Sequence, residues 1–205
     1  MTQPAMAERT IAVVSAGLTT PSSTRLLADR LTAAVRDQLD GRGTPYRVVV
    51  VELRDIAHEL TNNLLTGFPS RELAAVLESV VRADALIAVT PTFSASYNGL
   101  FKTFFDVLDD QALSGKPVLL GATGGTERHS LVLDYALRPL FVYLKAIVMP
   151  TGVYAASSDW GTGAGKLHPR IDRAAAELVD AIGNERRAAV DPFSHPTSFE
   201  DLLNS

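Results

Sequence analysis

The chain contains no cysteine among its 205 residues. A disulfide, a thiolate metal site, a cysteine nucleophile and dithiol redox chemistry each need a sulfur atom that this chain does not supply. Any redox role must therefore use a bound cofactor.

The chain also lacks an excess of positive charge and lacks long apolar runs. Lys and Arg number 19 against 23 Asp and Glu, a net charge of −4, whereas nucleic-acid surfaces are marked by clustered positive charge. No apolar run approaches the roughly 20 residues that span a bilayer. Glu8 and Arg9 stand where a signal peptide would carry its apolar segment. We expect a cytoplasmic protein with no nucleic-acid or membrane partner.

What is present is ordinary for a globular protein. Hydrophobic residues make up 46% of the chain and charged residues 20%, with 14 Gly and 11 Pro. At roughly 100 to 200 residues per domain, the length favours a single domain over residues 1–205. Residues 188–205 include Asp191-Pro192 and His195-Pro196 and show little periodicity, so we expect an irregular C-terminal tail there.

Apolar runs alternate with segments of helical periodicity. Continuous Val, Ile and Leu runs without polar alternation indicate strands that are buried on both faces, as in a parallel sheet covered by helices. The pattern predicts an α/β fold, a doubly wound five-stranded parallel sheet with helices on both faces. The predicted strands are residues 11–14, 48–51, 85–89, 118–121 and 147–154.

Capping residues and apolar stripes predict five helices. The first begins near Ser22 or Ser23 and ends around 41–43, the second begins at Ser70, and the third begins near Asn98. The fourth and fifth cover about 129–144 and 169–187. The polar stretch 54–69 is longer than most connections, which is typical of functional or mobile loops.

Ligands of an open parallel sheet bind outside the carboxyl ends of its strands, so the loops that follow the strands are the places to search. The first, residues 15–25, is a hydroxyl-rich turn that leads into a helix N-terminus. Free backbone N–H groups and the helix dipole favour an anion there, and Arg25 could add charge. Alternatively, Ser22 and Ser23 only cap the helix.

Two further loops could line a ligand. Residues 90–100 combine small and hydroxylated residues with Phe93 and Tyr97, which could line a flat heterocycle or could instead fill the core or a subunit interface. In residues 122–126, Gly124 and Gly125 leave the backbone amides open to close approach, although a plain turn would also use two glycines.

Other motifs are missing. The P-loop spacing places Trp160 where its first glycine should stand, and the esterase motif G-x-S-x-G is absent. The four histidines are isolated and none forms a pair at zinc-ligand spacing. We therefore expect no metal site.

Residues 90–103, Thr-Pro-Thr-Phe-Ser-Ala-Ser-Tyr-Asn-Gly-Leu-Phe-Lys-Thr, resemble the T-P-x-Y/F-x-x-x-Y-x-G-x-x-K-x signature of the NAD(P)H-dependent FMN reductases with a flavodoxin-like fold. Residues 122–125, together with 133–140 and 144–146, are similar to the subgroup that supplies reduced FMN to two-component monooxygenases. The partners of that subgroup include alkanesulfonate and luciferase-like monooxygenases. The resemblance extends over about residues 10–154.

The resemblance implies where FMN binds. The first loop departs from the family's usual G-S-x-R form and lacks its arginine. Arg25 lies nearby in the sequence and is the candidate to replace that arginine. Tyr135 corresponds to a tyrosine on an irregular helix at a tetramer interface, over a neighbour's flavin; its alternative is an ordinary interface or core aromatic. The implied residues are Ser15, Gly17, Pro21, Ser22, Ser23, Thr24 and Arg25 for the phosphate, Pro91, Thr92, Phe93, Ser94, Ala95, Ser96 and Tyr97 for the ribityl chain and ring, and Thr123, Gly124 and Gly125 for the pyrimidine edge.

The resemblance also implies the reaction. Hydride passes from NADPH or NADH to flavin N5, so the cofactors carry the chemistry and we nominate no catalytic side chain. Backbone N–H groups of residues 123–125 could stabilise negative charge at the N1/O2 side of the flavin. A homodimer or homotetramer and a partner monooxygenase are expected. Two alternatives stay open: a quinone, azo-dye or chromate-type reductase that retains FMN, and an electron-carrier flavodoxin.

Overall fold

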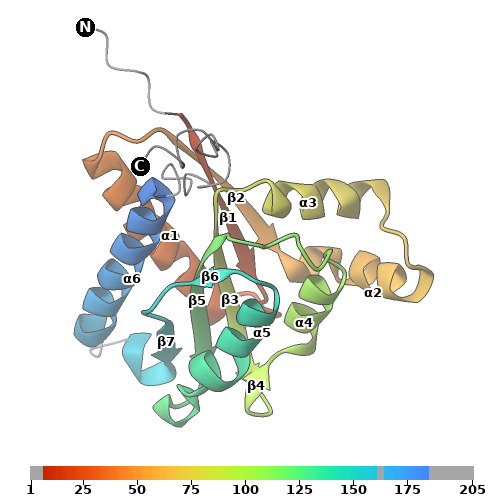
Figure 1. Ribbon diagram of the computed structural model, residues 1–205. Coiled ribbons are helices and arrows are strands. Elements are labelled where there is room, and N and C mark those ends of the chain that lie inside the picture. The colour runs from red at the N-terminus through yellow and green to blue at the C-terminus, as the bar shows by residue number, and fades with distance from the viewer. Residues whose placement is uncertain (1–6, 161–163, 185–205) are drawn as a thin grey trace, which may run out of the picture.

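A twisted, mostly parallel sheet runs through the centre of the molecule (Figure 1). The computed structural model describes residues 7–160 and 164–184, so the expected tail at 188–205 lies outside the described residues. The strand order is β2-β1-β3-β5-β6, while β4 pairs with β3 and β7 pairs with β5. The strands are β1 (Arg9–Ser15), β2 (Tyr46–Glu52), β3 (Ala85–Phe93), β4 (Ser96–Tyr97), β5 (Pro117–Gly124), β6 (Ile147–Val148) and β7 (Val153–Ala156).

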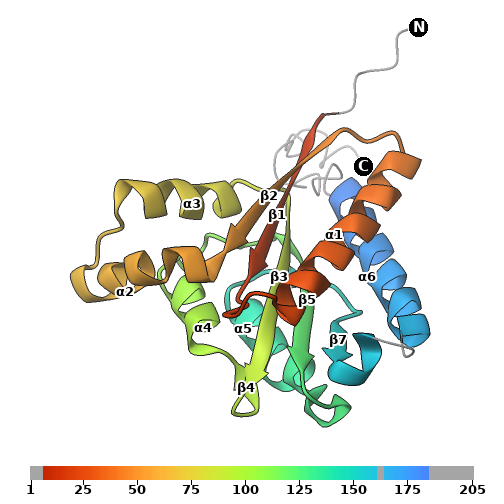
Figure 2. The same ribbon diagram turned by 180° about the vertical axis from the view of Figure 1, so that it is seen from behind.

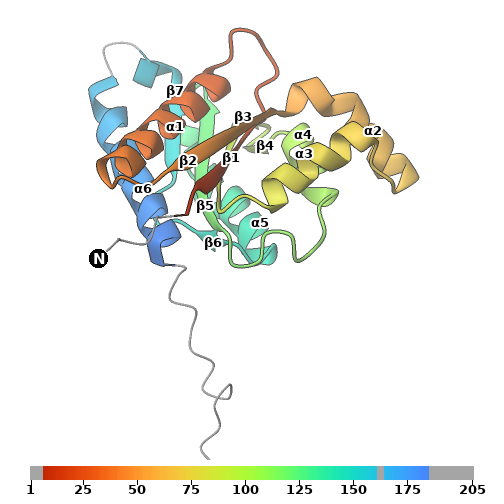
Figure 3. The same cartoon turned by 90° about the horizontal axis from the view of Figure 1, so that it is seen from above.

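Helices cover both faces of the sheet, which confirms the predicted α/β doubly wound class. Helices α1 and α6 pack on one face, and α3, α4 and α5 lie on the other, as the views from behind and from above show (Figures 2 and 3). Helix α2 extends the second group outward beside α4. The helices are α1 (Ser23–Gly41), α2 (Ala57–Thr66), α3 (Arg71–Val81), α4 (Gly99–Asp106), α5 (Arg138–Tyr143) and α6 (Ala164–Asn184).

The apolar runs of the central strands β1, β3 and β5 each contribute to two cores at once. In β1, Ile11 and Val13 belong to the core under α1 and α6, whereas Ala12 and Val14 belong to the core under α3 to α5. Successive side chains of a strand point to opposite faces, so a run that is apolar at every position buries all of them. This explains why the runs of the central strands lack polar alternation. The runs in the edge strands are not buried on both faces as predicted, because Val50 of β2 is 41% exposed and Ile147 of β6 is 51% exposed.

The last predicted strand is divided in two. Residues 147–154 contain β6 and the first half of β7, and Pro150, Thr151 and Gly152 interrupt the pairing between them. Both segments pair with β5. The sheet also has a two-residue antiparallel strand, β4, which folds back on the end of β3. The predicted number of five strands is therefore too low.

The helix predictions hold at the capped starts and at the end of the first helix, which the structure places at Gly41, and they need correction at other places. Ser22, Ser70 and Asn98 are the N-caps of α1, α3 and α4. The stretch 54–69, expected to be a loop, holds a 3-10 turn (Leu53–Ile56) and α2. The expected helix 129–144 is broken into a π-helix (Leu133–Leu137) and the short α5. Helix α6 begins at Ala164, before the predicted start at Pro169.

Among the described residues, no helix is both long enough and apolar enough to cross a membrane.

Candidate functional site

Strands β1, β3 and β5 end side by side at one edge of the sheet. Ser15, the last residue of β1, is in register with Val89 of β3, and Pro91 of β3 is in register with Thr123 of β5. The structure therefore brings the three candidate loops together at the carboxyl edge, as expected for the ligand-binding edge of a doubly wound sheet. This edge lies at the bottom of Figure 1, where the β3–β4 hairpin projects.

The first loop folds tightly against the start of α1. Ser22 accepts a hydrogen bond from the backbone N–H of Arg25 at 3.2 Å, so capping is a role that Ser22 does fulfil. A Cβ at Gly17 would lie 2.1 Å from the Ser22 Oγ. Only glycine lets the loop pass so close to this hydroxyl. Ser23 and Pro21 are exposed, while Thr24 is buried in the first turn of α1.

Ser15 is the best sign in the structure that the first loop takes a ligand. Its side chain is fully buried, and its Oγ has no hydrogen-bond partner. Buried hydroxyls are normally paired, so an orphan needs an explanation. Ser15 is the last residue of β1, and the loop that follows it leads to the N-terminus of α1, whose free N–H groups favour an anion. A flavin phosphate therefore fits the residues that are present.

Arg25 does not point freely into the first loop. Its guanidinium donates to Asp29 at 2.8 Å and also pairs with Glu52. The hydrogen bond to Asp29 is the main cause of the raised pKa of Arg25. A second arginine, Arg54, donates to the Thr20 hydroxyl in the first loop.

Sequence reasoning missed Glu52 and Arg54 because it assigned 54–69 to a separate loop. The available signal was that Glu52 follows the predicted strand 48–51, and the structure pairs Glu52 with Ser15 at the end of β1.

Two buried polar contacts join the three loops. The Asn98 side chain donates to the Ala16 carbonyl at 2.8 Å and accepts from the Phe101 N–H at 2.8 Å. The hydroxyls of Thr24 and Thr123 lie 2.8 Å apart, joining the first turn of α1 to the end of β5. These contacts connect the three loops to one another.

The β3–β4 hairpin presents an aromatic ring to solvent. Ser94 and Ala95 form its turn with φ values of 48° and 65°, in the left-handed region that non-glycine residues rarely adopt. Phe93 is 50% exposed, which excludes the alternative that it fills the core. Tyr97 is half-buried and contacts Phe101, with 5.9 Å between ring centroids. Pro91, Thr92 and Ser96 are also half-buried.

Tyr154 of β7 packs against the third loop and forms a hydrogen bond with it. Its hydroxyl donates to the Thr126 carbonyl at 2.9 Å, and burial raises the pKa of this tyrosine. A Cβ at Gly124 would lie 2.1 Å from the Tyr154 Oη, whereas nothing lies within 4 Å of a Cβ at Gly125. Gly124 is thus required for packing, and Gly125 leaves its backbone open. The sequence offered no signal for Tyr154.

A cavity of about 420 Å³ lies between the hairpin and the segment after the third loop. Ala95 and Tyr135 both line it, so the structure brings these two predicted residues together. Tyr135 lies on the π-helix and is 80% exposed, which excludes the core alternative. The other lining residues are Arg128, His129, Leu131, Val132 and Ala136, and of these only Ala136 lies in a segment, 133–140, that the family resemblance marks.

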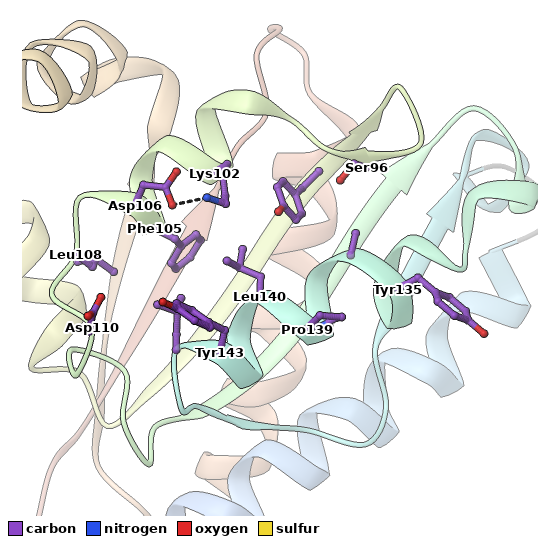
Figure 4. A pocket seen from close by; sticks show the side chains of 13 residues that line it. Ser96, Lys102, Phe105, Asp106, Leu108, Asp110, Tyr135, Pro139, Leu140 and Tyr143 are labelled. Carbon is purple, nitrogen blue, oxygen red and sulfur yellow. Dashed lines mark hydrogen bonds and ion pairs between the residues drawn. The ribbon is translucent and has the colours of Figure 1, made fainter.

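A larger groove of about 620 Å³ separates α4 from α5, and the predicted site residues among those that line it are Ser96, Tyr97 and Tyr135. In Figure 4, Phe105 and Leu140 lie in this groove, the Lys102–Asp106 ion pair lies along its rim, and Tyr135 points away from it. Within residues 7–160 and 164–184, no group of three His, Asp or Glu side chains could hold a metal ion. The described edge thus offers hydroxyls, backbone amides and apolar surface.

Comparison with known proteins gives a consistent picture. The family model described as NADPH-dependent FMN reductase matches residues 9–161. An FMN reductase (NADPH) from Pseudomonas aeruginosa is 45% identical over 150 residues, which cover 73% of this chain and 78% of that protein. The NADH-dependent FMN reductase SfnF of Pseudomonas fluorescens is 41% identical over 150 residues, with the same two coverages.

A solved structure shares both fold and sequence. The oxidoreductase from Corynebacterium diphtheriae superposes with a TM-score of 0.84 at 46% identity, covering 88% of this chain and 99% of that one. A flavodoxin-like protein from Agrobacterium tumefaciens, at 17% identity and a TM-score of 0.58, shows the fold alone. The predicted flavodoxin-like class is confirmed.

Proposed function

The chain belongs to the family of NADPH-dependent FMN reductases, and on that premise we propose that it transfers hydride from NAD(P)H to FMN and releases reduced FMN to a partner monooxygenase. FMN supplies the hydride acceptor, so no side chain has to act as acid or nucleophile. The protein's task is to hold the flavin, orient it and leave one face accessible.

The observation that carries the proposal is the union of three loops at the carboxyl edge with a buried, unpartnered Ser15 hydroxyl. Ser15 and the backbone N–H groups at the start of α1 would hold the phosphate. The open backbone at Gly125 would meet the pyrimidine edge, and the exposed ring of Phe93 would give apolar contact. We propose the remaining residues of the three loops as further flavin contacts.

Release of the flavin is supported by the openness of this edge. Leu18 and Phe93 are exposed around it, so a flavin bound to the described residues of this chain would keep part of its surface accessible. A flavin that a monooxygenase must receive has to leave readily, and an accessible site allows this. The accessible face would accept either NADPH or NADH.

Steady-state oxidation of NADPH and NADH with FMN, FAD, riboflavin and a quinone as acceptors tests the proposal. We expect the purified protein to need added FMN and to turn over many equivalents of it. Quinone reduction by protein that keeps its own flavin would instead identify the flavin-retaining reductase. Bound flavin without NAD(P)H oxidation would identify the electron carrier.

A further inference from the structure

Two arginines and three carboxylates meet beside the first loop. Glu52, the last residue of β2, is in register with Ser15 at the end of β1. Its carboxylate pairs with Arg25 of α1 and lies 3.6 Å from Arg54. Asp29 and Asp55 complete the group, which we name the Glu52 cluster: Arg25, Asp29, Glu52, Arg54 and Asp55.

The Glu52 cluster carries a formal charge of −1, because two guanidinium groups face three carboxylates. It nevertheless touches the loop that would hold a phosphate, since Arg54 donates to the Thr20 hydroxyl. A phosphomonoester carries about −1.5 to −2 charges at neutral pH. A site built for tight phosphate binding would direct its arginines at the anion, often as bidentate pairs. Here the nearest arginines are already paired.

Glu52 is the member that engages both arginines. Its side chain is 21% exposed, against 52% for Asp29 and 66% for Asp55. Solvent screens the two aspartates more strongly, and each of them pairs with one arginine of the cluster, Asp29 with Arg25 and Asp55 with Arg54. Removing the Glu52 charge therefore acts on both guanidinium groups at once.

We propose that Glu52 sets the flavin affinity of this enzyme by withholding Arg25 and Arg54 from the FMN phosphate. The phosphate is then held by backbone N–H groups and hydroxyls of the first loop alone, and FMN remains an exchangeable substrate. This inference rests on the proposed function. It makes Glu52 the residue that determines whether the protein releases FMN or retains it.

Glu52→Gln tests the proposal, because it removes the carboxylate charge and keeps the shape. Binding of FMN and of riboflavin to the flavin-free protein is measured by quenching of flavin fluorescence. Riboflavin has the same ring and no phosphate, so it reports any change that does not act through the phosphate. Glu78→Gln is the matched control, since Glu78 pairs with Arg82 on α3, just before β3 begins at the opposite edge.

We expect Glu52→Gln to bind FMN roughly threefold or more tightly at low salt, as one unit of charge in a partly exposed site allows. The gain shrinks at high salt, and riboflavin binding and the Glu78→Gln control stay unchanged. Unchanged FMN affinity, or an equal change for FMN and riboflavin, would overturn the proposal. A wild-type protein that binds neither flavin would instead refute the proposed function.

Arg54→Gln provides a second test that does not depend on the folding of the first variant. At high salt, where through-space effects of charge are screened, we expect Arg54→Gln to leave FMN and riboflavin binding unchanged, because Glu52 keeps this guanidinium from the phosphate. A loss of FMN binding alone would show that Arg54 contacts the phosphate and would overturn the proposal. An arginine that only supports the loop would weaken both flavins equally, and that result would also overturn the proposal.

Discussion

At the scale of single residues, Gly17 shows how closely the first loop is packed. We predict that Gly17→Ala lowers the free energy of unfolding by about 1–2 kcal/mol, because its Cβ would displace the Ser22 Oγ and disturb the cap of α1. The KM for FMN should rise while the KM for NADPH changes less. Urea denaturation and steady-state kinetics measure the two effects.

Gly41→Ala is the control, because Gly41 ends the same helix and a Cβ at this position would have nothing within 4 Å. It should change stability by no more than about 0.5 kcal/mol. If the two alanine variants have the same free energy of unfolding and the same KM for FMN, the close approach of Gly17 to Ser22 contributes to neither.

The roles of residues that depend on local chemistry could be predicted from the sequence. Contacts between residues that are distant in the sequence could not. Ser22, Ser70 and Asn98 are recognisable caps because short polar side chains satisfy free N–H groups. The contact of Thr24 with Thr123 spans 99 positions and depends on how α1 sits over β5. No local pattern encodes such a contact.

At the scale of elements, Glu177 fastens α6 to the segment between β6 and β7. Its carboxylate accepts from the Thr151 N–H and the Thr151 hydroxyl, both at 2.7 Å. Burial alone would raise the pKa of Glu177, but these hydrogen bonds and Arg173 outweigh it, so the pKa lies below its ordinary value.

The sign of the pH dependence follows from that shift. A folded pKa below the unfolded value stabilises the protein above about pH 4.3, and the stabilisation is lost as the pH falls through the folded pKa. We predict that Glu177→Gln costs about 1–3 kcal/mol at neutral pH and progressively less below about pH 4. Denaturant unfolding over this pH range measures it; a cost that is constant with pH would contradict it.

Elements were predictable where their periodicity is strong. Helix α2 was missed because only Leu60 and Asn63 of it are buried, too few for an apolar stripe. The π-helix carries no compositional sign, since Leu133–Leu137 fits an ordinary helical turn equally well. The division between β6 and β7 was hidden by apolar residues on both sides of Pro150.

At the scale of the whole molecule, the expected homo-oligomer remains a prediction. Leu131, Tyr135, Val142 and Tyr143 are exposed along the π-helix and α5, a surface that a second copy could cover. We predict that Tyr135→Ala weakens the homo-oligomer, so that its molar mass in solution falls. The free energy of unfolding of the single chain should change by no more than about 0.5 kcal/mol. Light scattering after size-exclusion chromatography measures the mass.

Phe68→Ala is the matched control, because Phe68 is also 80% exposed but lies between α2 and α3. It should leave the molar mass unchanged. An oligomer that survives Tyr135→Ala, or a monomeric wild-type protein, would contradict the prediction.

We propose that FMN is a substrate that leaves the protein after reduction. Anaerobic mixing of a small amount of protein with a large molar excess of FMN and NADPH tests it most directly, with the visible absorbance of oxidised flavin as the readout. We predict that the absorbance of the whole FMN pool bleaches. A loss of absorbance that stops at one equivalent of flavin per chain would show instead that the protein keeps its flavin.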